Sequence, residues 1–260
     1  MSQIGAGDDE QEDSLMEWKD YAARIKEVLQ LEGSPVAITY SMEPSAEALA
    51  RKCRVCNAFL LARDGETIDL TPESSACPGG TWFLGLGEGP TGERAKAHKD
   101  FLINGEKLFC SLAVYYRVMN MTSDVPIGLA DHVIISPLEK AEKRPDLVLF
   151  VCNAEQGCRL VTLDLYCTGV AQKIQMVGAT CYQAVTYPLT TGELNVSLMD
   201  YTSRRIRGFK SSDLLVTVPY HRMHGIVRSI EGCTAGTAKM EIPDAFRRTL
   251  KEDVLKELEE

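Results

Sequence analysis

The amino-acid sequence predicts an α/β protein, with α+β as the alternative: a single domain in which a mixed sheet is flanked by helices. Short runs of β-branched and other apolar residues alternate along the chain with segments whose apolar residues recur at helical spacing. The 260 residues, 45% of them apolar, are enough for one substantial core. The sequence also has no internal repeat and no evident linker that would divide it.

The N-terminal part predicts a tail, a helix and a strand. Residues 1–13 hold five acidic and no basic residues, which predicts a disordered acidic tail. Ser14 and Glu17 match a capping box, and apolar residues then follow at helical spacing as far as Leu29. The β-branched run 36–40, which directly follows a proline, predicts the first strand.

The middle of the chain predicts helices with an irregular segment between them. Residues 46–62 have the apolar spacing of a helix, and residues 67–70 follow as a short strand. Residues 77–92 carry six glycines and two prolines, which predicts an irregular loop. Residues 95–116 predict one or two helices, broken near Asn104-Gly105.

The C-terminal half predicts further strand and helix units. The predicted strands are 132–136, 147–153, 195–199 and 214–219, and the first two are apolar enough to be covered on both faces. The predicted helices are 154–167, 179–187 and 220–230.

The last helix is predicted over residues 243–260, after a domain that spans residues 14–242. It places Phe246, Leu250, Val254 and Leu258 on one stripe. Such a stripe is typical of a docked helix or of an arm that contacts a partner or a second copy of the chain.

Charge excludes some classes of partner. Lys and Arg total 28 against 37 Asp and Glu, so the net charge is -9, and a phosphate backbone is not expected to be the main partner. The sequence contains no run of eighteen or more apolar residues, so no membrane span is predicted. The acidic N-terminus lacks the features of a signal peptide, so the sequence predicts a cytoplasmic protein.

The chain contains nine cysteines, and some of them form its clearest chemical feature. Most free cysteines are small buried hydrophobic residues. However, Cys53 and Cys56 form a Cys-x-x-Cys pair, and Cys77 begins a Cys-Pro-Gly-Gly sequence. Three thiolates with free backbone amides nearby are typical of iron–sulfur ligation. A structural zinc site would need a second close pair, and a thioredoxin-like pair would follow a strand rather than lie in helical sequence.

Two further clusters of residues are weaker signals. His221 and His224 share one helix face, as a metal pair or as surface or capping residues. The only dense basic cluster contains Arg204, Arg205, Arg207 and Lys210. It would either bind a small anion or form a solvated face that balances the protein's own carboxylates. Glycine-rich residues 77–92 do not match a nucleotide-binding loop, and no hydrolase elbow or metalloprotease helix is present.

The order of several short motifs resembles the domain of unknown function 169 family, which is common in anaerobic bacteria and archaea and is essentially uncharacterised. The resemblance covers about residues 30–232. It rests on Ser34-Pro35-Val36-Ala37-Ile38, Cys56-Asn57-Ala58, Leu70-Thr71, Cys77-Pro78-Gly79-Gly80, Pro145-Asp146-Leu147-Val148-Leu149-Phe150, Ala179-Thr180-Cys181, Tyr187-Pro188, Asn195-Val196-Ser197-Leu198, Ser203-Arg204-Arg205 and the late strand at 214–219.

The resemblance implies that Cys56, Cys77 and Cys181 belong together, because family members tend to keep cysteines near these positions. The chain departs from the family at 198–201, where a glycine and a further cysteine are expected. If that cysteine is a ligand elsewhere, Cys110, Cys53 or Asp200 would have to replace it here.

Three functional hypotheses follow, and whether the protein is an enzyme stays open. In the first, Cys56, Cys77 and Cys181, with Cys110 or Cys53, bind an iron–sulfur cluster for redox or reductive metabolism with a redox partner protein. In the second, the arginine cluster holds a small anionic metabolite and Cys77 is a reactive thiol, without a metal. In the third, the chain is a non-catalytic subunit or homo-oligomer that docks through its last helix.

Overall fold

The computed structural model describes residues 18–49, 51–252, 254 and 256. The strands are β1 (Val36–Ser41), β2 (Ile68–Leu70), β3 (His132–Pro137), β4 (Leu147–Cys152), β5 (Asn195–Ser197) and β6 (Leu214–Pro219). The α-helices are α2 (Trp18–Leu29), α3 (Val55–Arg63), α4 (Pro78–Phe83), α5 (Gly92–Asp100), α6 (Leu112–Met119), α7 (Ala154–Thr168), α8 (Tyr187–Thr191), α9 (Tyr201–Ile206), α10 (Met223–Arg228) and α11 (Asp244–Arg247). Two π-helical segments, η1 (Phe101–Gly105) and η3 (Tyr182–Thr186), and two 3-10 segments, η2 (Leu138–Lys140) and η4 (Tyr220–Arg222), complete the elements.

The described strands form one sheet in the order β2-β3-β1-β4-β6-β5. The predicted mixture of helices and sheet is confirmed, but the sheet is not mixed: every pairing between these six strands is antiparallel. Apolar strand sequences are compatible with either direction, because the alternation of side chains is the same in both. The direction is set by the path of the connections, which the local sequence does not encode.

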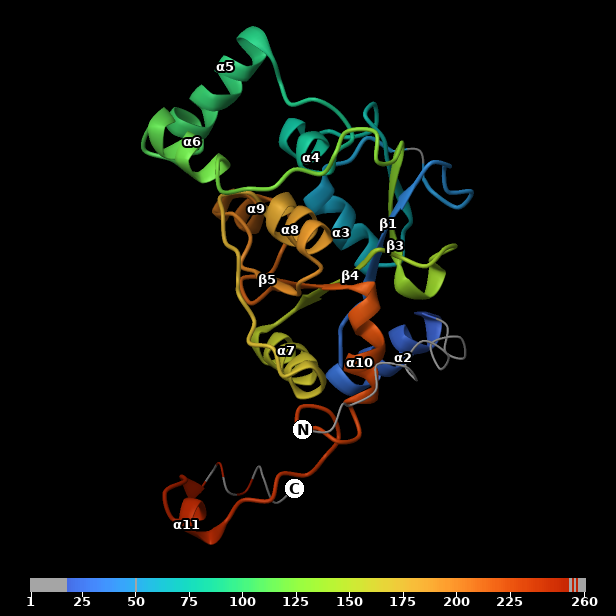
Figure 1. The fold of residues 1–260 in the computed structure, drawn as a ribbon, viewed down its shortest axis with the longest axis vertical. Helices are drawn as coiled ribbons and strands as arrows, with labels where there is room; N and C mark the ends of the chain where they lie inside the picture. The colour runs from blue at the N-terminus through green and yellow to red at the C-terminus, as the bar shows by residue number, and fades with distance from the viewer. Residues whose placement is uncertain (1–17, 50, 253, 255, 257–260) are drawn as a thin grey trace, which may run out of the picture.

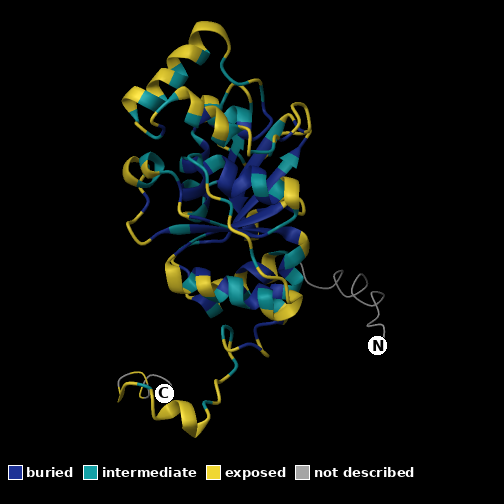
Figure 2. Cartoon of the chain, turned by 60° about the vertical axis from the view of Figure 1, so that its left-hand side comes forward, coloured by how far each residue is buried: buried dark blue, intermediate teal, exposed yellow. Residues whose placement is uncertain are grey.

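Helices cover both faces of the sheet, as the apolar strands predicted (Figure 1). Alternate residues of β4 divide between two cores, which Leu149 and Phe150 illustrate. Phe150 packs in the core that α2, α7 and α10 cover, whereas Leu149 packs in the core beneath α3 and η3. The buried residues are concentrated at the centre of the molecule (Figure 2). The sheet is therefore a rigid platform between two helical layers.

Two predictions about the segments before and after β2 were wrong. The helix predicted over 46–62 begins only at Val55, because the backbone of Leu49 and of Cys53 forms isolated parallel bridges to Ile68 and Ser75 instead. The loop predicted over 77–92 contains helix α4, which has a proline in its first turn, where the missing N–H costs nothing.

Residues 92–119 form a helical extension that we call the cap, built from α5, η1 and α6. The predicted break near Asn104-Gly105 is confirmed, because η1 ends there. The cap lies above α4 and α9, at the end of the molecule remote from α2 and α7 (Figure 1). The helix predicted over 179–187 also differs: it continues through Pro188 as α8 and ends at Gly192.

Only part of what the sequence predicted for the two termini falls on residues that the structure describes. The acidic tail and the capping box at Ser14 lie outside the described residues, as does Leu258. The predicted single C-terminal helix is interrupted, since α11 ends at Arg247 and turn residues follow. Phe246 is 64% exposed, so no apolar packing holds a longer helix in place. Across the described part of the chain, none of the helices combines the length and the apolar character that crossing a membrane requires.

Candidate functional site

A cavity of about 620 Å³ lies between the cap and the layer of helices above the sheet. Cys56, Cys77 and Cys181 all line it, although they come from three separate parts of the chain. The motif resemblance implied that these thiols belong together, and the fold places them in one cavity. A volume of this size accommodates a typical small organic ligand.

Cys56 lies in the first turn of α3. Burial raises the pKa of the Cys56 thiol, and the nearby Cys77 raises it further, whereas Arg207 and a hydrogen bond with Ser203 lower it. The effect of Arg207 does not offset burial, so a further positive charge or a metal would be needed to favour the ionised form of the thiol. Its neighbour Arg54 is the N-cap residue of the same helix and lines the cavity beside it.

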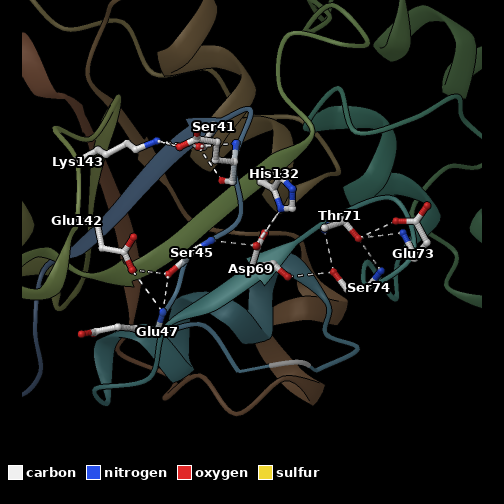
Figure 3. Close-up of polar contacts among 11 residues, drawn as sticks. Ser41, Ser45, Glu47, Asp69, Thr71, Glu73, Ser74, His132, Glu142 and Lys143 are labelled. Atoms are coloured by element: carbon white, nitrogen blue, oxygen red, sulfur yellow. Dashed lines mark hydrogen bonds and ion pairs between the residues drawn. The ribbon is translucent and has the colours of Figure 1, made fainter.

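Cys77 is the N-cap residue of α4, and its Sγ accepts a hydrogen bond from the Gly80 N–H at 3.4 Å. The chain reaches Cys77 through a turn after β2 whose hydrogen bonds are local (Figure 3). Ser74 Oγ donates to the Asp69 carbonyl and accepts from the Thr71 N–H at 2.8 Å. These contacts fix the path of the backbone immediately before the cysteine.

The backbone of Cys53 joins this turn to the start of α3. Its N–H donates to the Ser74 carbonyl, and its own carbonyl accepts from the Ala76 N–H at 2.8 Å. The Cys53 thiol is buried and donates to the Arg54 carbonyl at 3.3 Å, and it does not line the cavity. In the Cys-x-x-Cys pair, Cys53 therefore positions Cys77 beside Cys56 through its backbone.

Gly80 allows α4 to pack closely on α3. A Cβ atom at this position would lie 2.7 Å from Val55 Cγ2, which is far inside van der Waals contact, whereas a Cβ at Gly79 would meet nothing within 4 Å. The second glycine of the Cys-Pro-Gly-Gly motif is therefore required for packing. This close approach brings Cys77 to the helix that carries Cys56.

Cys181 comes from the segment before η3, and Asp200 determines its place. The Asp200 carboxylate accepts hydrogen bonds from both the N–H and the hydroxyl of Thr180, at 3.2 and 2.6 Å. It also caps α9, with the Ser203 N–H at 2.7 Å and the Ser203 hydroxyl at 2.7 Å. Burial raises the pKa of the Cys181 thiol well above its usual value, and Cys77 and then Cys56 raise it further.

The donors that this site offers are three mutually interacting thiols. Among the residues that the structure describes, no three His, Cys, Asp or Glu side chains are placed to hold a single metal ion. Cys110 is exposed and lies outside the cavity lining, and both oxygens of Asp200 are already engaged.

The arginines named from the sequence separate in the structure. Arg207 lines the cavity. Arg204 instead donates to the carbonyls of Leu198, Ser211 and Asp213, and the Arg205 guanidinium stacks 5.6 Å from the Tyr201 ring centroid. His221 and His224 also lie outside the cavity lining, and His224 contacts Tyr21 through Nδ1 at 3.2 Å.

Sequence reasoning missed two parts of the cavity. The first is Arg54, whose position between the two cysteines of the Cys-x-x-Cys pair was an available signal. The second is an apolar wall, which no motif marks. It consists of Pro78, Trp82, Phe83, Pro90, Ala95, Phe101, Leu102, Leu108, Phe109, Tyr115, Met119, Ala179 and Ile206. Glu106 lies at the polar end, where burial and then Asp200 raise the pKa of its carboxyl.

The comparisons with known proteins agree with the motif resemblance. A family model described as uncharacterised ArCR, domain of unknown function 169, matches residues 24–229. The chain is also 23% identical over 228 residues to Uncharacterized protein MJ0308 of Methanocaldococcus jannaschii, an alignment that covers 83% of this chain and 94% of the relative. No solved structure matches the chain.

Proposed function

We propose that this chain, which belongs to the domain of unknown function 169 family, is a cytoplasmic iron–sulfur protein of reductive metabolism. Cys56, Cys77 and Cys181 would hold the cluster at one end of a ligand-binding cavity. The observation that carries the proposal is that three thiols from separate segments line one cavity. Thiolates are the soft anionic donors that iron in clusters prefers.

Burial raises the pKa of Cys56, but two contacts at the thiols favour a negative charge. Arg207 lowers the pKa of Cys56, and the Gly80 N–H donates to the Cys77 sulfur. Such hydrogen bonds and charges are the means by which a protein stabilises thiolates and adjusts a cluster potential. Burial, and after it the neighbouring thiols, raise the pKa values of Cys56 and Cys181, so iron binding at these two thiols would release protons.

The fourth position of the cluster is open in this proposal. Cys53 is directed to a backbone carbonyl and Cys110 is exposed outside the cavity, so neither predicted residue is placed to complete a set of four. When bound, such a cluster supplies electrons from a redox partner protein or a Lewis-acidic iron.

The test is the iron and acid-labile sulfide content of protein purified without oxygen, together with its visible spectrum. We expect about three to four irons per chain. Cys77→Ser should lose most of the iron, whereas the matched variant Cys158→Ser, which removes an exposed thiol outside the cavity, should keep it. Colourless, iron-free wild-type protein after anaerobic cluster reconstitution would refute the proposal.

A metal-free enzyme with a reactive cysteine is the second candidate. The observation in its favour is that Cys77 accepts a backbone N–H and shares the cavity with Arg54 and Arg207. In that case Cys77 in iron-free protein would react with iodoacetamide faster at pH 7 than Cys158. A slower reaction at Cys77 would exclude this candidate.

A further inference from the structure

The first two segments of the cap, α5 and η1, are poorly packed, although Phe109 and Tyr115 later in the cap are buried. Neither α5 nor η1 contains a buried residue, and the cap is mostly exposed or half-exposed in Figure 2. Phe101 nevertheless lines the cavity while 54% of it is exposed. An apolar surface that faces a cavity and stays unburied is typical of a surface that a ligand covers.

Four further aromatic rings belong to the apolar wall of the cavity. Phe109 packs edge-on against Tyr115, with ring centroids 5.5 Å apart, and Trp82 stacks on Phe83 at 4.8 Å. All four rings line the cavity. An apolar or aromatic ligand body in contact with these rings and with Phe101 would cover the exposed apolar surface of η1.

The cavity also presents two cations, near Glu106. The guanidinium groups of Arg54 and Arg207 line it, and neither forms an ion pair with another described residue. Both influence Glu106, which also lines the cavity. Partly buried guanidinium groups that form no direct ion pair keep N–H donors available for an anion.

The geometry points to an amphipathic organic acid as the ligand: a carboxylate at Arg54 and Arg207, with an apolar body against the cap. This inference deepens the proposed function, on which its place in metabolism rests, by naming the substrate class. The acidic Glu106 and Asp200, which also line the cavity, limit the net positive charge. A singly charged carboxylate therefore fits these arginines better than a doubly charged phosphate.

The test measures binding of a fluorescent aromatic monoanion, 1-anilinonaphthalene-8-sulfonate, to full-length protein as purified. We expect one saturable site from which 4-phenylbutyrate and decanoate displace the dye. Inorganic phosphate, butyrate and the uncharged 4-phenylbutyramide should not displace it. Absence of a saturable site, or displacement by phosphate, would overturn the inference.

Variants locate the site. Arg207→Gln should weaken dye binding about tenfold, the effect of losing one charge-assisted contact. Arg117→Gln, at an exposed arginine of α6 outside the cavity lining, should leave it within twofold. Phe101→Ser should also weaken binding, whereas Phe246→Ser on α11, which is similarly exposed, should not. Equal effects within either pair would place the dye elsewhere and refute the assignment.

Iron content measured on the same samples separates this inference from the cluster proposal. Saturable, Arg207-dependent binding in protein that stays iron-free after anaerobic cluster reconstitution would support the ligand class and refute the cluster. Iron-loaded protein that binds no dye would support the cluster and overturn the ligand class.

Discussion

Replacing Asp200 tests whether this residue holds the site together or binds the metal. In the structure its carboxylate joins the segment that carries Cys181 to the start of α9, through Thr180 and Ser203. We expect Asp200→Ala to destabilise the protein and to release Cys181 from its position. Asp200→Asn keeps one acceptor oxygen and should have a smaller effect.

The magnitude follows from the bonds that are lost. Loss of an N-cap side chain costs about 1 kcal/mol. Thr180 is only 2% exposed, so its N–H and hydroxyl cannot simply turn to water when the charged acceptor is removed, which adds about 2 kcal/mol. The free energy of unfolding should therefore fall by about 3 kcal/mol in Asp200→Ala and by about 1 kcal/mol in Asp200→Asn.

Urea unfolding of iron-free protein measures both variants, with the dependence on urea expected to be unchanged. A loss below about 1 kcal/mol in Asp200→Ala would refute the reasoning about the buried bonds. Iron content is the second readout. If Asp200→Asn lost as much iron as Cys77→Ser while staying folded, Asp200 would be a ligand and not a positioning residue.

The remaining predictions concern packing and thiol chemistry. Gly80→Ala should lower the unfolding free energy by about 1–3 kcal/mol through overpacking, as urea unfolding would measure. Gly79→Ala, at a position with open space, should change the unfolding free energy little, and equal losses in the two variants would contradict the packing argument. Burial raises the pKa of Cys152 to about 12. Since an unfolded thiol loses its proton above about 8.5, the unfolding free energy should fall between pH 9 and pH 12, and fall less in Cys152→Ala. Cys152 should also resist alkylation at pH 8 while exposed Cys158 reacts, as peptide mass spectrometry would show; similar labelling rates would contradict its burial.

The strands of this protein could be located from the sequence, because a buried strand is a local pattern. β1, β3, β4 and β6 lie within a residue or two of the predicted runs, since each places β-branched or large apolar side chains on both faces. Helix α7 was equally visible as the predicted helix 154–167, and the structure adds a capping box at Asn153, which the sequence had placed in the preceding strand. Where local and tertiary preferences competed, as at residues 46–54, the bridges to β2 and to the following turn replaced the expected helix.

The sequence by itself determined the class of fold, the positions of the main strands and the family motifs that single out Cys56, Cys77 and Cys181. Only the tertiary structure decided the antiparallel directions of the strands and the meeting of those thiols. It also distinguished Arg207, which lines the cavity, from Arg204, which donates hydrogen bonds to backbone carbonyls, and from Arg205, which stacks on a tyrosine ring. The physical reason is that periodicity and capping act over a few residues, whereas a cavity is formed by contacts between segments that are far apart in the chain.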